Sequence, residues 1–307
     1  MNELLRRLEE HFVSRRDKIV LRDDVNQPGM TYEQLDLLSG RVYGYLKERG
    51  IGREDTVMLC LPRGMQIPIA QIGVWKAGAS FVICEDTYAP ERIEFIRQDC
   101  GCRLFVSGDN WAELMAHDSL KGRETLHPHD LAYTVYTSGT TGNPKGVMHE
   151  FGNLDECCEA HQYKGKPLLK ETDVLAMNAP MNFVVYQMLF NAALFAGACV
   201  FIVPYSCIKN TTALMELYDR AGITCGFMTP SAFRVIRTLN PQLRWLLLGG
   251  ELCANLYRED ITLYNGYSMS ESGSPVCLFQ VDRAYSATPV GRNYGGHDLR
   301  LLDDGGS

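Results

Sequence analysis

Apolar and polar positions along the chain alternate between helical periods and short apolar runs. The helical periods fall at 1–18, at 31–50, at 65–78, from Pro90 onwards, from 188 to the turn at Gly197, and at 212–222. The apolar runs, each expected to be a strand, fall at 55–62, 80–84, 131–138, 199–203, 224–228, 244–250 and 261–267. Since these runs are continuous instead of alternating, they predict mainly parallel strands buried on both faces, and therefore an α/β fold.

Two of the expected helices carry clear terminal signals. Thr31 stands before the helix at 31–50 with Gln34 three residues later, which is the spacing of a capping box, and Gly50 follows the last turn. The first eighteen residues place apolar side chains at helical spacing among charged ones. They lack the uninterrupted apolar core of a signal peptide, so they predict a surface helix.

The composition is that of a globular protein without a nucleic-acid or membrane partner. The chain has 307 residues, of which 46% are hydrophobic and 22% charged, and this length suffices to bury a substantial core. The net charge of -7, with no basic block, argues against nucleic-acid binding. The most apolar run, 188–204, is interrupted by Asn191 and Gly197 and is too short to span a bilayer. We therefore expect a cytoplasmic protein.

Eleven cysteines are distributed along the chain without a CxxC motif. The closest pairs, Cys100 with Cys102 and Cys157 with Cys158, are spaced too tightly for a usual zinc site. In the absence of an export signal, we interpret them as reduced thiols that mostly serve as small core side chains.

The most informative segment is the loop YTSGTTGNPKG at 136–146, which follows an apolar run. Glycines let successive backbone N–H groups converge on one anion, and Thr and Ser hydroxyls add further donors. Lys145 adds a positive charge suited to phosphate. The combination is typical of a phosphate-binding loop. Its spacing is not G-x-x-x-x-G-K-[ST], which excludes the P-loop of nucleotide hydrolases and kinases.

This loop resembles the signature loop of the adenylate-forming, or AMP-binding, superfamily: acyl-CoA synthetases, aryl-acid ligases and nonribosomal peptide synthetase adenylation domains. Further segments resemble that family's motifs in the same order: TYEQL at 31–35, WKAGASFVICEDTYAPERI at 75–93, LLLGGE at 246–251 and YNGYSMSES at 264–272. In the last motif, Ser268 and Met269 replace the Gly and Pro of N-x-Y-G-P-T-E. The resemblance covers nearly the whole chain. It implies the large N-terminal domain of that fold, with mainly parallel sheets flanked by helices.

The resemblance also implies roles for individual residues. The implied cradle for the β- and γ-phosphates of ATP consists of Thr137, Ser138, Gly139, Thr140, Thr141, Gly142 and Lys145. Tyr267 would stack on adenine, with the backbone of Gly250 and Glu251 on the opposite side of the base. Ser270 would contact the α-phosphate. Glu271 would hold Mg²⁺, a cation that takes one or two carboxylates together with phosphate oxygens and water.

The implied reaction joins two negatively charged partners. A substrate carboxylate attacks the α-phosphorus of ATP, pyrophosphate leaves, and the acyl-AMP then passes its acyl group to the thiol of CoA or of a carrier-protein phosphopantetheine. Catalysis is therefore chiefly alignment and charge neutralisation, for which Lys145, Ser270 and Glu271 are the candidates. No nucleophilic side chain is needed. His149 is left open between a position in the site and a structural role at a strand end.

The acid-binding pocket is expected around the start of the helix before Gly197. Amino-acid-activating relatives have an Asp there that pairs with the substrate ammonium. Counting with the peptide-synthetase spacing brings Val184 to that position, and counting with the aryl-acid-ligase spacing brings Asn182, as those enzymes have Asn. Either alignment removes the carboxylate and favours an aryl, fatty or other acid without an α-ammonium. An amino acid held by another residue is the alternative. The expected lining residues are Asn182, Val184, Val185, Met188, Phe227, Met228, Leu247, Gly249, Gly266 and Ser274.

Two units are expected along the chain. Residues 1–280 form the AMP-binding core, with two subdomains that share the cleft, and the turn-rich segment 281–307 begins a smaller β-barrel-like subdomain. Family members continue with a ribose-binding Asp, a hinge and a small domain that carries a Lys, so we expect a fragment that binds nucleotide weakly and adenylates poorly. A non-catalytic nucleotide-binding module is the alternative from another class. The intact Lys145, Tyr267 and Glu271 favour descent from an enzyme.

Overall fold

The computed structural model describes residues 2–137, 143–159, 162–163, 166–294 and 298–300. Its larger sheet has nine strands in the order β16-β15-β14-β13-β12-β10-β11-β1-β2. They are β1 (Ile19–Arg22), β2 (Met30–Thr31), β10 (Val174–Met177), β11 (Cys199–Ile202), β12 (Cys225–Met228), β13 (Trp245–Leu248), β14 (Thr262–Tyr267), β15 (Cys277–Val281) and β16 (Arg292–Asn293). Within this order, the neighbours in the run β14-β13-β12-β10-β11-β1 are parallel. Strands β2, β15 and β16 pair antiparallel at the two edges.

A second sheet has five strands in the order β5-β3-β4-β6-β7. They are β3 (Thr56–Cys60), β4 (Ser80–Ile83), β5 (Leu104–Ser107), β6 (Leu131–Thr137) and β7 (Lys145–Glu150). All neighbours in it are parallel except β6 and β7, which form a hairpin. Two short strands, β8 (Gln162–Tyr163) and β9 (Lys166–Pro167), pair separately.

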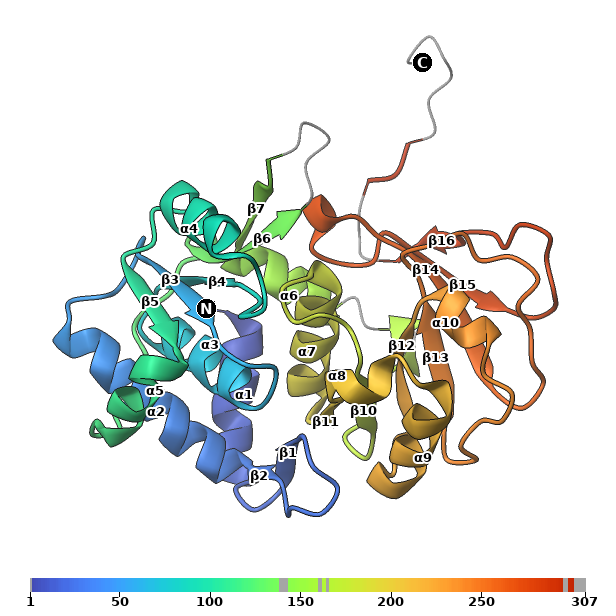
Figure 1. Ribbon diagram of the computed structural model, residues 1–307, viewed down its shortest axis with the longest axis horizontal. Coiled ribbons are helices and arrows are strands. Elements are labelled where there is room, and N and C mark those ends of the chain that lie inside the picture. The colour runs from blue at the N-terminus through green and yellow to red at the C-terminus, as the bar shows by residue number, and fades with distance from the viewer. Residues whose placement is uncertain (1, 138–142, 160–161, 164–165, 295–297, 301–307) are drawn as a thin grey trace, which may run out of the picture.

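Helices cover the sheets and connect their parallel strands (Figure 1). They are α1 (Glu3–Ser14), α2 (Tyr32–Glu48), α3 (Gln66–Lys76), α4 (Pro90–Asp99), α5 (Gly108–Ala116), α6 (Phe151–Glu159), α7 (Val184–Ala196), α8 (Tyr205–Ile208), α9 (Thr211–Ala221), α10 (Pro230–Arg234) and the 3-10 helix η1 (Ser270–Ser272). The predicted α/β fold with mainly parallel strands is confirmed. The capping box of α2 is present as predicted, with both reciprocal bonds between Thr31 and Gln34.

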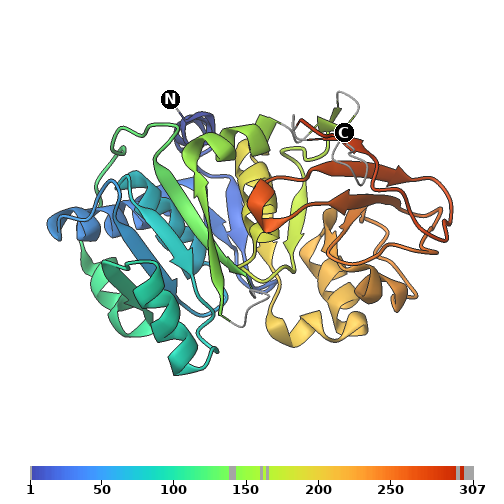
Figure 2. The same ribbon diagram turned by 90° about the horizontal axis from the view of Figure 1, so that it is seen from above.

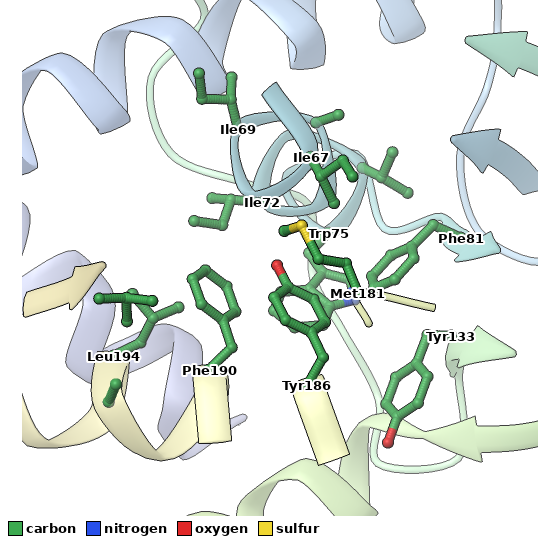
Figure 3. Close-up of a cluster of buried hydrophobic side chains, with 14 of the residues drawn as sticks. Ile67, Ile69, Ile72, Trp75, Phe81, Tyr133, Met181, Tyr186, Phe190 and Leu194 are labelled. Atoms are coloured by element: carbon green, nitrogen blue, oxygen red, sulfur yellow. The ribbon is translucent and has the colours of Figure 1, made fainter. Parts of the chain in front are cut away.

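Two buried helices join the sheets into one body. Helix α3 connects β3 to β4, helix α7 connects β10 to β11, and Figure 3 shows Ile72 and Trp75 of α3 facing Tyr186 and Phe190 of α7. All four side chains belong to one apolar cluster and are fully buried. Within this cluster Gln71 Nε2 donates to Gln187 Oε1 at 3.1 Å. Burial on every side explains why both helices are apolar with little amphipathic contrast.

Several elements differ from the sequence-based expectation. No strand was expected directly after the glycine-rich loop, but β7 follows it and α6 comes next. Strand β7 is largely exposed, so its residues lack the continuous apolar run that identifies the buried strands. The strands β1, β5, β10 and β15 were not predicted either. The described part of the final segment adds β16, antiparallel, to the edge of the nine-stranded sheet, and the boundary at 280 stays a prediction.

No described helix is long and apolar enough to cross a membrane. Of the eleven cysteines, Cys60, Cys84, Cys199, Cys225, Cys253 and Cys277 are buried, in keeping with their expected role as small core side chains.

Candidate functional site

Strands β6 and β7 pair antiparallel on either side of the predicted phosphate loop, and we call this pair the phosphate hairpin. Thr137, the last residue of β6, lies directly opposite Lys145, the first residue of β7. Lys145 is exposed, while Tyr136 is buried opposite Gly146 and donates its hydroxyl to Asp99 Oδ2 at 2.6 Å. The two flanking members of the predicted cradle are therefore brought together at one end of the sheet. Its remaining members, Ser138, Gly139, Thr140, Thr141 and Gly142, lie outside the described residues.

The short helix η1 faces this hairpin (Figure 2) and carries Ser270 and Glu271. Its conformation is set by Ser272, whose hydroxyl donates to the carbonyl of Met269 at 2.8 Å and of Ser274 at 2.7 Å. The helix ends at Gly273 with φ of 64°. Glu271 is exposed, and its carboxylate is available to a cation.

His149 connects the two halves of the site. Its ring is 2% exposed, stacks on Tyr133 with centroids 4.6 Å apart, and lies near the main chain of Ser270. Burial lowers the pKa of His149, so the ring is neutral at pH 7. A Cβ on Gly273 would lie 2.8 Å from Nδ1 of the ring. His149 thus packs beneath η1 as a structural link between β7 and the segment that bears Glu271.

A cleft of about 430 Å³ lies beside η1 where adenine binding is predicted. Gly250, Glu251 and Tyr267 all line it, and Tyr267 is 46% exposed. The Glu251 carboxylate points away to α10, where it accepts from the main-chain N–H and the hydroxyl of Ser231 at 3.1 and 2.8 Å. The backbone of Glu251 is therefore the part expected to face the nucleotide. The sequence did not indicate the lining residues Leu252, Cys253, Asn265, Ser268, Thr288 and Val290.

A second cavity, of about 440 Å³, adjoins the cleft at the start of α7. Seven predicted pocket residues line it: Val184, Val185, Met188, Phe227, Leu247, Gly249 and Gly266. Sequence reasoning missed Pro180, Phe183, Thr229, Met269 and Pro275. The described lining residues include no charged side chain. Gly250, Gly266 and Ser268 line both hollows, so the two are adjacent, and Ser270 lines the acid cavity.

Three predicted pocket residues are not among the described lining residues. Met228 is 3% exposed and packs in the core behind β12, because successive side chains of a strand point to opposite faces. Ser274 is buried after η1. Asn182 is 7% exposed and donates its Nδ2 to the hydroxyl of Tyr88 at 2.7 Å.

Among the described residues, no group of three or more His, Cys, Asp and Glu could hold a metal ion by itself. Glu271 is exposed on η1, which contacts β7, and one such carboxylate fits an ion that takes its remaining ligands from nucleotide phosphates and water.

The fold agrees with that of known proteins. The chain is 28% identical over 309 residues to surfactin synthase subunit 1 of Bacillus subtilis (strain 168), covering 90% of this chain and 9% of that protein. Two solved structures share the fold along 100% of this chain. The N-terminal subdomain of NpsA of Klebsiella oxytoca, in complex with 3-hydroxyanthranilyl-AMSN, has a TM-score of 0.85 at 17% identity over 83% of its length. The anthranilate CoA ligase AuaEII, in complex with anthranoyl-AMP, has a TM-score of 0.86 at 18% identity over 67% of its length.

The chain spans less than a tenth of the curated relative's length. The model of the AMP-binding enzyme family matches residues 8–307, which include the phosphate hairpin, η1 and both hollows. On this match, and on the fold and site geometry above, the chain belongs to the family of AMP-binding enzymes.

Proposed function

We propose that this chain supplies the ATP and acid sites for the adenylation half-reaction, in which a carboxylate oxygen bonds to the α-phosphorus of ATP and pyrophosphate leaves. The product is an acyl-AMP, whose acyl group passes to the thiol of CoA or of a carrier protein. The observation that carries the proposal is the shared wall of the two hollows. Because Gly250, Gly266 and Ser268 border both, an acid in the apolar cavity and a nucleotide in the cleft would meet beside Ser270.

The described residues supply the charges and donors that this reaction needs. Lys145 and Thr137 stand side by side at the hairpin mouth, where they would hold the leaving phosphates. Ser270 would contact the α-phosphate next to the attacking carboxylate. Mg²⁺, held by Glu271, would supply charge neutralisation between the repelling partners. These side chains orient the reactants and need form no covalent intermediate.

The cavity favours an acid without an α-ammonium. Val184 lines it where amino-acid-activating relatives have Asp, and no charged side chain is present among the described lining residues. The amide of Asn182 is engaged by Tyr88, which favours the spacing that brings Val184 to the pocket. An unpaired ammonium in such surroundings costs several kcal/mol. The aryl-adenylate ligands of the two structural relatives fit the same chemistry.

Calorimetry with AMP and two non-hydrolysable acyl-adenylate mimics tests both parts of the proposal. The mimics are the sulfamoyl adenosines of 3-phenylpropionate and L-phenylalanine, which differ only in the α-ammonium. A phenyl group that buries roughly 100 Å² gains about 2.5 kcal/mol. The phenylpropionyl mimic should therefore bind about fiftyfold more tightly than AMP. The phenylalanyl mimic should bind at least about tenfold more weakly than its partner.

Two outcomes would contradict different parts. If AMP binds but neither mimic improves on it, the chain is a nucleotide-binding module without an acid site. If the phenylalanyl mimic binds more tightly than the phenylpropionyl mimic, the substrate is an amino acid. Lys145→Ala should weaken ATP more than AMP, because it loses contacts to the β- and γ-phosphates. Lys47→Ala is the matched control, since this exposed lysine pairs with Glu124 away from both hollows.

A further inference from the structure

The segment 177–183 forms one wall of the acid cavity although it has no regular secondary structure beyond its first residue. It leaves the end of β10 and enters α7, and Pro180 and Phe183 within it line the cavity. Backbone groups in such a segment lack ladder partners and must be satisfied by side chains or water. The described side-chain contacts of this segment come from the loops that follow β3 and β4 in the other sheet, and from Tyr218 and Phe227.

Arg63, in the loop after β3, binds the start of the segment. Its Nη1 donates to the carbonyl of Ala179 at 2.8 Å, its Nε to that of Val203 at 2.7 Å, and its Nη2 to that of Met177. The guanidinium also lies 4.9 Å from the ring centroid of Tyr205. One planar cation therefore joins the carboxyl ends of β10 and β11 to the five-stranded sheet.

Tyr88, in the loop after β4, binds the end of the segment. Its hydroxyl accepts from Asn182 Nδ2 at 2.7 Å, and the Arg92 guanidinium lies 4.1 Å from its ring centroid. Asn182 Oδ1 is buried without a hydrogen-bond partner among the described residues. Among the described residues, the Tyr88 hydroxyl is thus the hydrogen-bond partner of Asn182, which immediately precedes Phe183 and Val184 of the cavity wall.

A third contact ties the same segment to the opposite wall. Asn178 Nδ2 donates to the carbonyl of Phe227 at 3.2 Å and to the hydroxyl of Tyr218 at 2.6 Å. Phe227 lines the cavity from β12. With Asn178 fixed at one end and Asn182 at the other, the position of the wall depends on the side chains that hold it.

We propose that Arg63 and Tyr88 are positioning residues for the acid substrate: they hold segment 177–183 and so determine the shape of the acid cavity without lining it. The inference rests on the proposed function for the identity of the ligand. Neither residue borders the nucleotide cleft in the described structure. Their loss should therefore affect the acyl part of an acyl-adenylate and leave the nucleotide part unchanged.

The test compares Tyr88→Phe and Arg63→Lys with wild type in binding AMP and the 3-phenylpropionyl sulfamoyl adenosine. Tyr88→Phe removes one hydroxyl and keeps the ring, and lysine cannot reproduce the planar fork of arginine. Each variant should weaken the mimic about five- to tenfold and change AMP by less than about twofold, because one hydrogen bond to a buried partner is lost. Tyr43→Phe is the matched control, since its hydroxyl donates to Glu124 at 2.7 Å and the residue lines neither the acid cavity nor the nucleotide cleft.

Hydrogen exchange of the amides in 177–185 provides a readout without ligand. Faster exchange there in Tyr88→Phe, and not in Tyr43→Phe, is expected. Equal weakening of both ligands, or unchanged binding and exchange in both variants, would overturn the inference. If wild type binds neither ligand while exchange still responds to Tyr88→Phe, the proposed function fails and the holding role of Tyr88 stands. Because Tyr88→Phe is mild, a folding defect of Arg63→Lys would not prevent the test.

Discussion

Replacement of Gly273 by alanine should destabilise the protein through two separable effects. Gly273 ends η1 with φ of 64°, a left-handed conformation that costs a residue with a Cβ about 1–2 kcal/mol. In addition, the new Cβ would lie 2.8 Å from Nδ1 and 3.0 Å from Cε1 of His149, well inside a normal contact of about 3.5–4 Å. The ring is buried and stacks on Tyr133, so it has little room to move. Overpacking of this kind costs about 1–3 kcal/mol, so the total is about 2–5 kcal/mol.

Gly50→Ala isolates the backbone part of this loss. Gly50 has the same φ of 64°, and a Cβ there would meet no atom within 4 Å. Urea unfolding should therefore show a loss of only about 1–2 kcal/mol for Gly50→Ala. The difference between the two glycine variants measures the clash with His149.

A double-mutant cycle with His149→Ala completes the argument. Once the ring is absent, Gly273→Ala should cost no more than Gly50→Ala, which gives a coupling of about 1–3 kcal/mol between positions 149 and 273. Equal losses at the two glycines with no coupling would refute the reasoning, because they would show that the ring does not press on η1. Gly273→Ala should also weaken Mg²⁺-dependent ATP binding, since it displaces the segment that carries Glu271.

Three further predictions concern stability, pH and metal. Thr31→Ala should lower the free energy of unfolding by about 1 kcal/mol in urea titrations, because it removes the cap of α2, whereas Thr212→Ala in the exposed first turn of α9 should cost less. Burial lowers the pKa of His11 from 6.5 to about 4, and the positive charge of nearby Arg15 acts in the same direction. As the pH falls, His11 is therefore protonated in the unfolded chain before it is protonated in the folded one. Stability should fall by about 2 kcal/mol from pH 7 to pH 5, and His11→Gln should abolish that part of the pH dependence. Glu271→Gln should remove the enhancement of ATP binding by Mg²⁺ in calorimetry and leave AMP binding intact; an unchanged Mg²⁺ effect would reject Glu271 as the ligand.

The sequence predicted those elements whose signals are local and strong. The buried parallel strands β3, β4, β11 and β13 appear as continuous apolar runs, and the start of α2 follows from Thr31 and Gln34. Strand β7 was missed because it is held by its hairpin partner β6 while most of its side chains face solvent. Register and pairing, and not apolar periodicity, make it a strand.

The residues of the candidate site also fall into those that the sequence predicted and those that it did not. Motif resemblance indicated seven residues that line the acid cavity, and it indicated Gly250, Glu251 and Tyr267 in the nucleotide cleft. It did not separate Met228 from Phe227, because the face that each strand residue presents depends on the sheet packed behind it. Nor could it decide the role of His149, whose neighbours Tyr133 and Ser270 come from a different strand and from η1.

By itself, the sequence determined the α/β class, the capped helix and the composition of the phosphate loop, since each depends on residues close together in the chain. Only the tertiary structure decided which polar groups satisfy one another, such as Tyr88 with Asn182, which are 94 residues apart. Such pairs depend on the order of strands in two sheets and on the packing of α3 against α7. No local propensity encodes that order, so the shape of the acid cavity is a property of the assembled fold.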